Sequence, residues 1–494
     1  MKLRYALPLL AVTATAGCDN FLVEEPQDFF SPENFPASEA DANLALGGIQ
    51  TYHTRQDYFS RGWWFVAEIP SDHSRVTEAN GARRDHDAFS VTAQNEWIRR
   101  VWQAAYGSIN ASNVLIQRVP EITAIPEARR AQIVAAAKFW RAFDYLNLAR
   151  VYGEVPIHET PVASLEEARN ATRAPLADVY ALIVKDLEEG CSVLPATWPE
   201  GPGKPTKGAA CAALADAYLN MSGEPLKQNK WADAARAAKV VMDMGTHRLR
   251  PSFRELWLIA NKTDPEFIFS IQFQNNDADG LVTTQSRPGG IGTESGFDYW
   301  NTTEAFMNTF ATADARKDPT FLTEVLFNNI TYTYRAGVAG TTQWGTNVEN
   351  RRPYWEKFFD DNRTVHTDRG RRTDANVPIY RYADVLLMYA EAENEANGPG
   401  AAYAAINQVR RRANMPEFSG MSQAEFRDAV RQERSYELAF ECKRWFDLKR
   451  WGTWLEVLKA DPVAGPRIQP FHRWAPLPQQ ELDNSPGLVQ NPGY

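Results

Sequence analysis

Alanine-rich amphipathic segments that arrive in pairs constrain the fold of this chain more than any other feature. Their apolar residues recur at the helical period, and Gly or Pro follows where the periodicity stops. Helices are expected at about residues 126–151 and 176–189, 207–220 and 231–244, 380–396 and 401–413, and 422–439 and 441–458. The pattern predicts a mainly α protein with about four helix pairs.

Small residues on the second pair allow its two helices to approach closely. They are Ala210, Ala213, Ala217, Ala234 and Ala238. A unit of about 34 to 40 residues is typical of tetratricopeptide-like repeats, which stack to share one core. We therefore expect a tetratricopeptide-like helical repeat scaffold.

Two stretches lack long apolar periods and are expected to be irregular. The first precedes a helix expected at 96–118, and the second includes short strands expected at 266–273 and 331–334. The expected organisation is a signal peptide at 1–17 and a single domain at 18–494, divided into an irregular N-terminal region 18–95, helical repeats 96–260 and 378–460, a loop-rich insertion 261–377 and a C-terminal tail 461–494. Loops on a rigid scaffold are where function is expected.

The N-terminus has the parts of a signal peptide. Lys2 and Arg4 precede an apolar run at 6–12, and small residues stand directly before Cys18. This arrangement predicts export and lipid attachment to Cys18, although Thr15 stands where Leu is usual and ordinary secretion with a chance cysteine is the alternative. Stable anchoring takes two or more acyl chains. No later run approaches the ~20 apolar residues of a membrane span.

The composition favours a packed core and argues against nucleic-acid partners and a disulfide framework. With 44% hydrophobic and 12% aromatic residues the chain can build a packed core. A net charge of −9 argues against nucleic acid or an anionic membrane surface as partner. With Cys18 lipidated, Cys191, Cys211 and Cys442 form an odd set, which we interpret as buried small residues rather than disulfide partners.

Glu433, Glu437 and Glu441 recur every fourth residue and share one helix face. Aligned carboxylates can hold a metal or act as acid and base, but no Glu-x-x-His accompanies them. A structural ion network is favoured. The basic residues close enough in sequence to pair with these acids are Arg434, Lys443, Arg444, Lys449 and Arg450, and Arg444 is expected to pair with Asp447 at i, i+3.

No other sequence pattern indicates catalysis. The seven His residues lack metal-ligand spacing, and there is no nucleophile elbow or phosphate loop. Residues 275–280 resemble the start of a calcium loop, but Ser286 replaces the Glu of the twelfth position, so a polar turn is favoured. We expect a binding protein with no metal and no cofactor.

Several motifs distributed over nearly the whole mature chain indicate a family. They are Cys18 to Leu22 with Pro26 and Phe35; Trp102, Tyr106, Ile109, Asn110 and Asn113; Arg141-Ala-Phe and Tyr152-Gly-Glu-Val-Pro156; Ile379-Tyr-Arg-Tyr-Ala-Asp-Val-Leu-Leu-Met-Tyr-Ala-Glu-Ala392; Ile406-Asn-Gln-Val-Arg410; Glu433-Arg434 with Glu437-Leu-Ala-Phe-Glu441; Arg444-Trp-Phe-Asp-Leu-Lys-Arg-Trp451; and Gln490-Asn-Pro-Gly-Tyr494. With them the sequence resembles the SusD/RagB family of outer-membrane nutrient-binding lipoproteins.

The resemblance implies an α-helical fold with four tetratricopeptide-like repeats that acts as a lid over a TonB-dependent β-barrel transporter. The ligand it implies is an oligosaccharide, which is bound rather than hydrolysed. It also implies a lipid-anchored place on the outer membrane. Cys442 stands where Gly is common in the family.

Aromatic and polar residues of the two irregular regions are the candidate glycan contacts, because flat rings stack on sugar faces while polar groups bond hydroxyls. They are Arg61, Trp63, Trp64 and Asp72 in the first region and Tyr299, Trp300 and Trp344 in the second. We expect at least one of the four tryptophans to anchor ligand, worth about 2 kcal/mol on truncation. Core packing is the alternative for each.

Two other functions use the same scaffold: capture of peptides, and a plain repeat scaffold for protein partners. Peptidase genes beside this gene would favour peptide capture. A free concave face, together with the absence of a neighbouring transporter gene, would favour the protein-interaction scaffold. The sequence itself does not name the ligand, its linkage or its length.

Overall fold

The computed structural model describes residues 35–76, 81–162, 164–273, 280–282, 285, 299–327, 330–333, 353–358 and 373–494. The signal peptide, Cys18, Trp344 and residues 275–279 of the calcium-like segment lie outside these ranges. None of the helices described is long and apolar enough to cross a bilayer.

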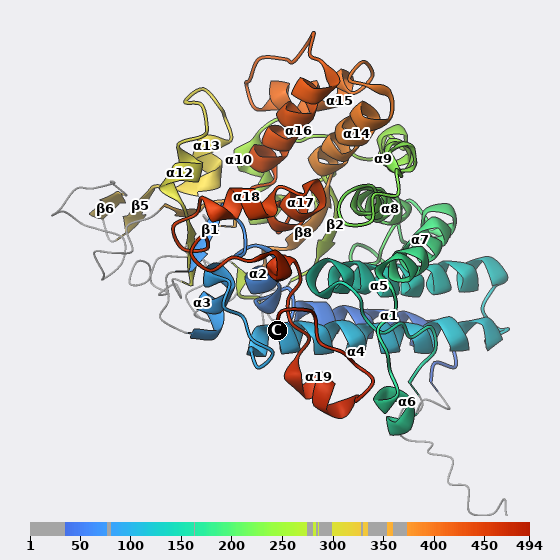
Figure 1. The fold of residues 1–494 in the computed structure, drawn as a ribbon. Helices are drawn as coiled ribbons and strands as arrows, with labels where there is room; N and C mark the ends of the chain where they lie inside the picture. The colour runs from blue at the N-terminus through green and yellow to red at the C-terminus, as the bar shows by residue number, and fades with distance from the viewer. Residues whose placement is uncertain are drawn as a thin grey trace, which may run out of the picture.

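A continuous series of helices forms the body of the molecule, each packed on the next (Figure 1). In packing order they are α4 (Glu96–Arg118), α5 (Glu127–Tyr152), α7 (Leu176–Val193), α8 (Lys207–Ser222), α9 (Trp231–Asp243), α14 (Tyr382–Asn397) and α16 (Gln423–Glu437). Helix α1 (Glu39–Thr54) lies along α4 and α5. The mainly α prediction is confirmed, and the assignment of these helices to tetratricopeptide-like units stays a prediction.

Burial explains why α5 and α8 occupy the middle of this series. Residues 135–152 of α5, apart from the half-buried Lys138, and residues 208–222 of α8 are buried on all sides, as expected of helices that are covered by neighbours all round. Side-chain caps fix the starts of the neighbouring helices. Asn95 accepts from the Trp97 backbone N–H, and Ser422 forms a reciprocal capping box with Glu425.

Short antiparallel strand pairs occupy the irregular regions within the described residues. They are β1 (Ser74–Val76) with β3 (Trp300–Thr302), β2 (Phe267–Ile271) with β8 (Val377–Arg381), β4 (Phe321–Leu322) with β7 (Tyr354–Trp355), and β5 (Glu324–Phe327) with β6 (Ile330–Thr333). The strands expected at 266–273 and 331–334 are thus confirmed as β2 and β6. In the first pair Ser74 lies opposite Thr302, which joins the two irregular regions.

The remaining elements are short. They are α6 (Leu165–Arg169), α10 (Phe253–Leu256), α12 (Glu304–Met307), α13 (Lys317–Thr320), α15 (Tyr403–Arg412), α19 (Gln479–Asn484), η1 (Val119–Glu121), η2 (Ile259–Asn261) and η4 (Pro470–Arg473). The C-terminal tail packs back on the body, where the Asn491 amide donates to the Tyr152 carbonyl at 2.9 Å.

Two expectations about helices are wrong. The N-terminal region expected to be irregular contains α1, α2 (Gly62–Ala67) and α3 (Gly81–Ala88), and the Gly-Gly pair inside α1 weakens its helical pattern in the sequence. The single helix expected at 441–458 is instead α17 (Arg444–Trp451) and α18 (Trp454–Lys459). Gly452 ends α17, because its φ of 76° is left-handed and does not continue a helix. Helix α17 packs against α8.

The expectation for the cysteines is also wrong. Cys191 and Cys211 form a disulfide with their Cα atoms 4.9 Å apart, and Cys442 is free and buried. The loop after α7 turns the chain back so that α8 lies along α7, which brings together two residues 20 positions apart. An odd number of cysteines therefore did not exclude one bridge.

Candidate functional site

Three of the four predicted tryptophan anchors are core residues, and the fourth, Trp344, lies outside the described residues. Trp63, Trp64 and Trp300 expose 3%, 0% and 0% of their surface. The Trp64 ring lies between neighbours, 6.0 Å from Trp300 and 5.7 Å from Trp355 between centroids, and its indole N–H donates to the Phe59 carbonyl at 2.9 Å. A ring enclosed in this way has no free face for a sugar, so their assignment as binding anchors is corrected to core packing.

Helix α2 places Trp63 and Trp64 in the core because it lies close to α4. Its first residue is Gly62, where an added Cβ would come within 2.5 Å of the Asp57 carbonyl oxygen and 3.2 Å of the Val101 side chain. Only a residue without a side chain permits that approach.

Tyr299 remains a candidate contact because it is half-buried at the start of β3. The Arg83 guanidinium lies 3.8 Å from its ring centroid and that of Arg61 lies 5.5 Å away. The Tyr299 backbone N–H donates to the Gln285 carbonyl at 2.9 Å, which fixes the residue's position. An aromatic ring with guanidinium donors nearby can contact both the apolar face and the hydroxyls of a sugar.

The sequence analysis proposed both Arg61 and Tyr299 but missed Arg83, which lies closer to the ring than Arg61 does. Arg83 lies on α3, in the stretch expected to be irregular. Arg83 and Tyr299 are far apart in the sequence, so no local pattern signals their contact.

Asp72 is held in an ion pair rather than presented to a ligand. Both of its oxygens accept from Arg444 at 2.8 Å. Burial opposes its ionisation, yet neighbouring His73 and Arg444 hold the pKa of Asp72 well below its usual range. The pair ties the first irregular region to α17.

Glu68 lies beside this pair, is fully buried, and provides a pH-dependent contact. Burial raises its pKa from 4.5 to about 7, against hydrogen bonds donated by Ser74 Oγ at 2.8 Å and the Cys442 backbone N–H at 2.9 Å. A raised carboxyl pKa gives stability that is present below about pH 4.5 and lost as the pH rises through 7.

We expect Glu68→Gln to remove that loss, because the uncharged amide can still bond both partners: its oxygen accepts from the Cys442 N–H, and its NH2 group donates to Ser74 Oγ instead of accepting from it. The melting temperature of the variant, relative to that of wild type, should therefore be higher at pH 8 than at pH 5. Thermal unfolding at the two pH values measures it. A constant difference would show that Glu68 ionises normally.

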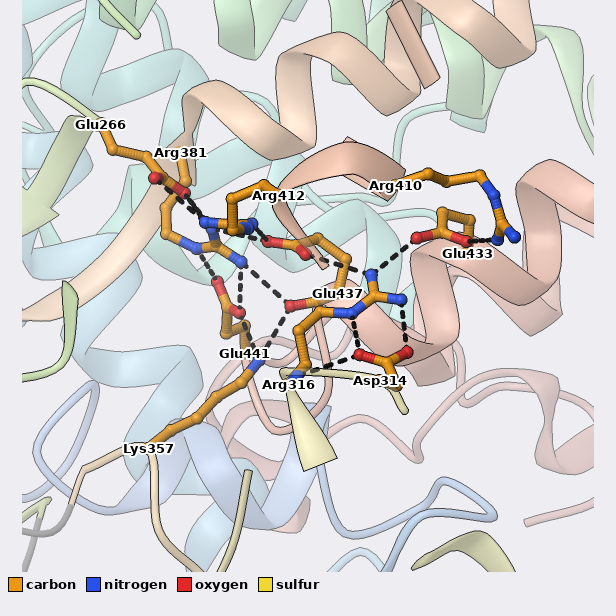
Figure 2. A network of polar contacts seen from close by, with 10 residues as sticks. All are labelled: Glu266, Asp314, Arg316, Lys357, Arg381, Arg410, Arg412, Glu433, Glu437 and Glu441. Carbon is orange, nitrogen blue, oxygen red and sulfur yellow. Dashed lines mark hydrogen bonds and ion pairs between the residues drawn. The ribbon is translucent and has the colours of Figure 1, made fainter. Parts of the chain in front are cut away.

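The carboxylates Glu433, Glu437 and Glu441 belong to a buried ion network (Figure 2). Arg381 is its centre, with Nε 2.7 Å from Glu441 Oε2 and Nη1 2.6 Å from Glu266 Oε1 and 3.0 Å from Glu437 Oε1. The remaining members are Asp314, Arg316, Lys357, Arg410 and Arg412. Five acids therefore face five bases.

The network holds the 261–377 insertion on the helical scaffold. Arg316 donates from the insertion to Glu433 on α16 at 2.7 Å, and Lys357 donates to Glu441 at 2.8 Å. Burial opposes the ionisation of Glu437, but Arg412, Arg381 and Arg316 hold its pKa well below its usual range. The prediction of a structural network is confirmed.

The predicted partners, however, are wrong. Arg444 pairs with Asp72, and Asp447 instead accepts from Arg434 and Arg450, each at 2.9 Å. The real partners of the glutamates come from segments far away in sequence. Within the described residues no group of three or more His, Cys, Asp or Glu side chains is placed to hold a metal ion.

Comparison with known proteins identifies the family. A family model described as the SusD family matches residues 214–494, and a second, described as starch-binding and associating with the outer membrane, matches residues 31–219. The first model covers more than half of the chain. The chain therefore belongs to the SusD family, as its C-terminal motifs predicted.

Individual relatives agree over almost the full length. SusD-like protein P25 of Formosa agariphila is 26% identical over 97% of this chain and 96% of its own. A SusD homolog from Bacteroides thetaiotaomicron superposes with a TM-score of 0.84 at 23% identity, over 94% of this chain and 98% of its own. Surface glycan-binding protein A from B. thetaiotaomicron, solved with laminarihexaose, gives 0.77 at 20% identity over 92% and 99%. Such likeness establishes the fold.

Proposed function

We propose that this protein is a lipid-anchored outer-membrane protein that captures an oligosaccharide at the cell surface and delivers it to a TonB-dependent transporter. The observation that carries the proposal is the match of the family models, one of which is described as starch-binding and associating with the outer membrane. The glycan-binding protein solved with laminarihexaose supports a glycan as ligand. Tyr299 with Arg83 and Arg61 is the contact we assign to it.

We propose binding without catalysis. The aligned glutamates that were weighed as acid and base, Glu433, Glu437 and Glu441, are held in ion pairs: Glu437 and Glu441 each contact Arg381 within 3.0 Å, and Glu433 contacts Arg316 at 2.7 Å. A carboxylate held ionised by a neighbouring guanidinium is a poor proton donor near neutral pH.

Tyr299→Ala tests the proposed contact. A glycan array first identifies a binding oligosaccharide, and calorimetry then compares the variants. Loss of the ring should weaken binding about 30-fold, or about 2 kcal/mol. Tyr389→Ala, at a half-buried tyrosine on α14, is the control and should bind normally. Equal affinity of Tyr299→Ala and wild type would remove Tyr299 from the site, and an array without any bound glycan would contradict the function.

Cys18→Ala tests the anchor. Without a thiol to acylate, the variant should move from the membrane to the soluble fraction in cells that lack the transporter, because no other attachment is expected. Wild type in the same cells is the control. Variant that stays with the membranes would contradict lipid attachment at Cys18.

A further inference from the structure

A cleft of about 440 Å³ is lined by residues of α4, α6 and α19. Figure 1 shows where these three helices lie in the fold. The walls of the cleft come from three segments of the chain: α4, the stretch from residue 156 to 171 that carries α6, and α19 with the residues that follow it. Binding clefts for small ligands commonly enclose about 300 to 1,000 Å³.

Hydrogen bonds between the walls form this cleft before any ligand arrives. Tyr106 Oη donates to the Pro156 carbonyl at 2.8 Å, and the Val162 backbone N–H donates to Asn110 Oδ1 at 2.9 Å. The third wall is joined to α4 by a bond from Gln103 Nε2 to Glu481 at 3.1 Å. A site held open in this way loses little entropy when it binds.

The lining combines aromatic rings with neutral polar groups. Tyr106 and His158 meet edge to face with centroids 5.9 Å apart. Burial lowers the pKa of His158, so at neutral pH its ring is uncharged, with one donor and one acceptor nitrogen. The Asn110 amino group and the exposed Asn484 amide add further donors and acceptors.

Charge narrows the class of ligand. The cleft has one acid, Glu481, and one base, Arg169, so it has no positive excess to hold a phosphate or a polyanion. Amide and imidazole groups near aromatic rings instead suit a neutral, hydroxyl-rich ring.

The cleft is separate from the Tyr299 contact. Trp97, near the start of α4, lies 5.7 Å from the Arg83 guanidinium, which in turn covers Tyr299. Tyr106 and Asn110 follow nine and thirteen residues later on the same helix. At 1.5 Å per residue they lie about 14 to 20 Å further along its axis.

We propose that this cleft is a second binding site for a short neutral saccharide, in addition to the contact at Tyr299. The inference rests on the proposed function. Two separate sites on one protein raise the overall affinity for a ligand that can occupy both sites at once, without new contacts at either site.

The test measures binding by calorimetry with laminarihexaose, maltohexaose, cellohexaose and xylohexaose as neutral probes and hexagalacturonate as an anionic probe. The proteins are wild type, Tyr299→Ala, Asn484→Ala, the pair His158→Ala with Asn484→Ala, and all three substitutions together. Asn170→Ala, exposed on the segment that carries α6 but outside the cleft, is the matched control. Thermal unfolding checks each fold, and Asn484→Ala tests the cleft without removing a buried ring.

We expect Tyr299→Ala to retain residual binding of a neutral probe, which the cleft substitutions reduce at least tenfold and Asn170→Ala leaves unchanged. Binding that only the cleft substitutions weaken would also support the cleft, while removing Tyr299 from the site. Three results would each overturn the second site and leave the proposed function standing. The cleft substitutions could leave binding unchanged, Tyr299→Ala alone could abolish binding completely, or the protein could prefer hexagalacturonate. Wild type that binds no neutral probe here and no glycan on the array would mark failure of the proposed function itself.

Discussion

Glu437→Gln is expected to destabilise the protein by about 3 to 5 kcal/mol, because it breaks a buried ion network from one side. Glu437 is fully buried and contacts Arg316, Arg381 and Arg412. The amide is nearly the same size as the carboxylate, so packing is retained while three guanidinium groups lose a shared negative partner. The uncompensated positive charge in a fully buried site is the main cost.

Unfolding in guanidinium chloride followed by circular dichroism measures this loss. Glu417→Gln is the matched control, since Glu417 also pairs with an arginine, Arg411, at 2.7 Å, but both side chains are at least half exposed. An exposed pair contributes about 0 to 1 kcal/mol, so the control should unfold almost like wild type. Equal losses in the two variants would contradict the role given to the network.

The effect of Glu437→Gln should also depend on pH. The pKa of Glu437 lies below its ordinary value of 4.5 in the folded chain. Its contribution is therefore present above pH 4.5 and lost as the pH falls through the folded pKa. The stability difference between wild type and variant should accordingly shrink in acid.

The helical scaffold could be predicted from the sequence because its signals are local. The expected helix at 96–118 is α4 to the residue, since Asn95 caps its start and the apolar period is unbroken. The break at Gly452 was missed because a single glycine near the end of a periodic segment is compatible with either a continued helix or a stop.

The site could be predicted only in part because its contacts are long-range. Nothing in the order of residues indicates that Arg316 meets Glu433, 117 positions later, or that Arg83 covers Tyr299. The disulfide is a similar case, because it depends on how two helices pack. Among the aromatic residues the sequence suggested too many contacts. Trp64 and Tyr299 look equally suited to bind a sugar, and only their burial in the folded chain shows that Trp64 is a core residue while Tyr299 is partly exposed.

Trp64→Ala should therefore lower stability by about 3 to 5 kcal/mol without removing a ligand contact. The indole is fully buried among Trp300, Trp355 and Phe358, whose ring centroids lie 6.0, 5.7 and 5.3 Å away, and its removal leaves a cavity between rigid rings that cannot collapse. Trp64→Phe should restore part of the loss, because a smaller ring fills part of the space.

Chemical unfolding and calorimetry on the same samples separate packing from recognition. Truncation of Trp231, half-buried at the first position of α9, is the control and should cost less, since water can fill the space that the side chain leaves. For Trp64→Ala below its melting temperature, the affinity for the array-identified oligosaccharide should stay within about threefold of wild type, equivalent to under 1 kcal/mol. A stable variant that no longer binds would return Trp64 to the binding surface, since loss of a core ring cannot spare the fold and remove recognition alone.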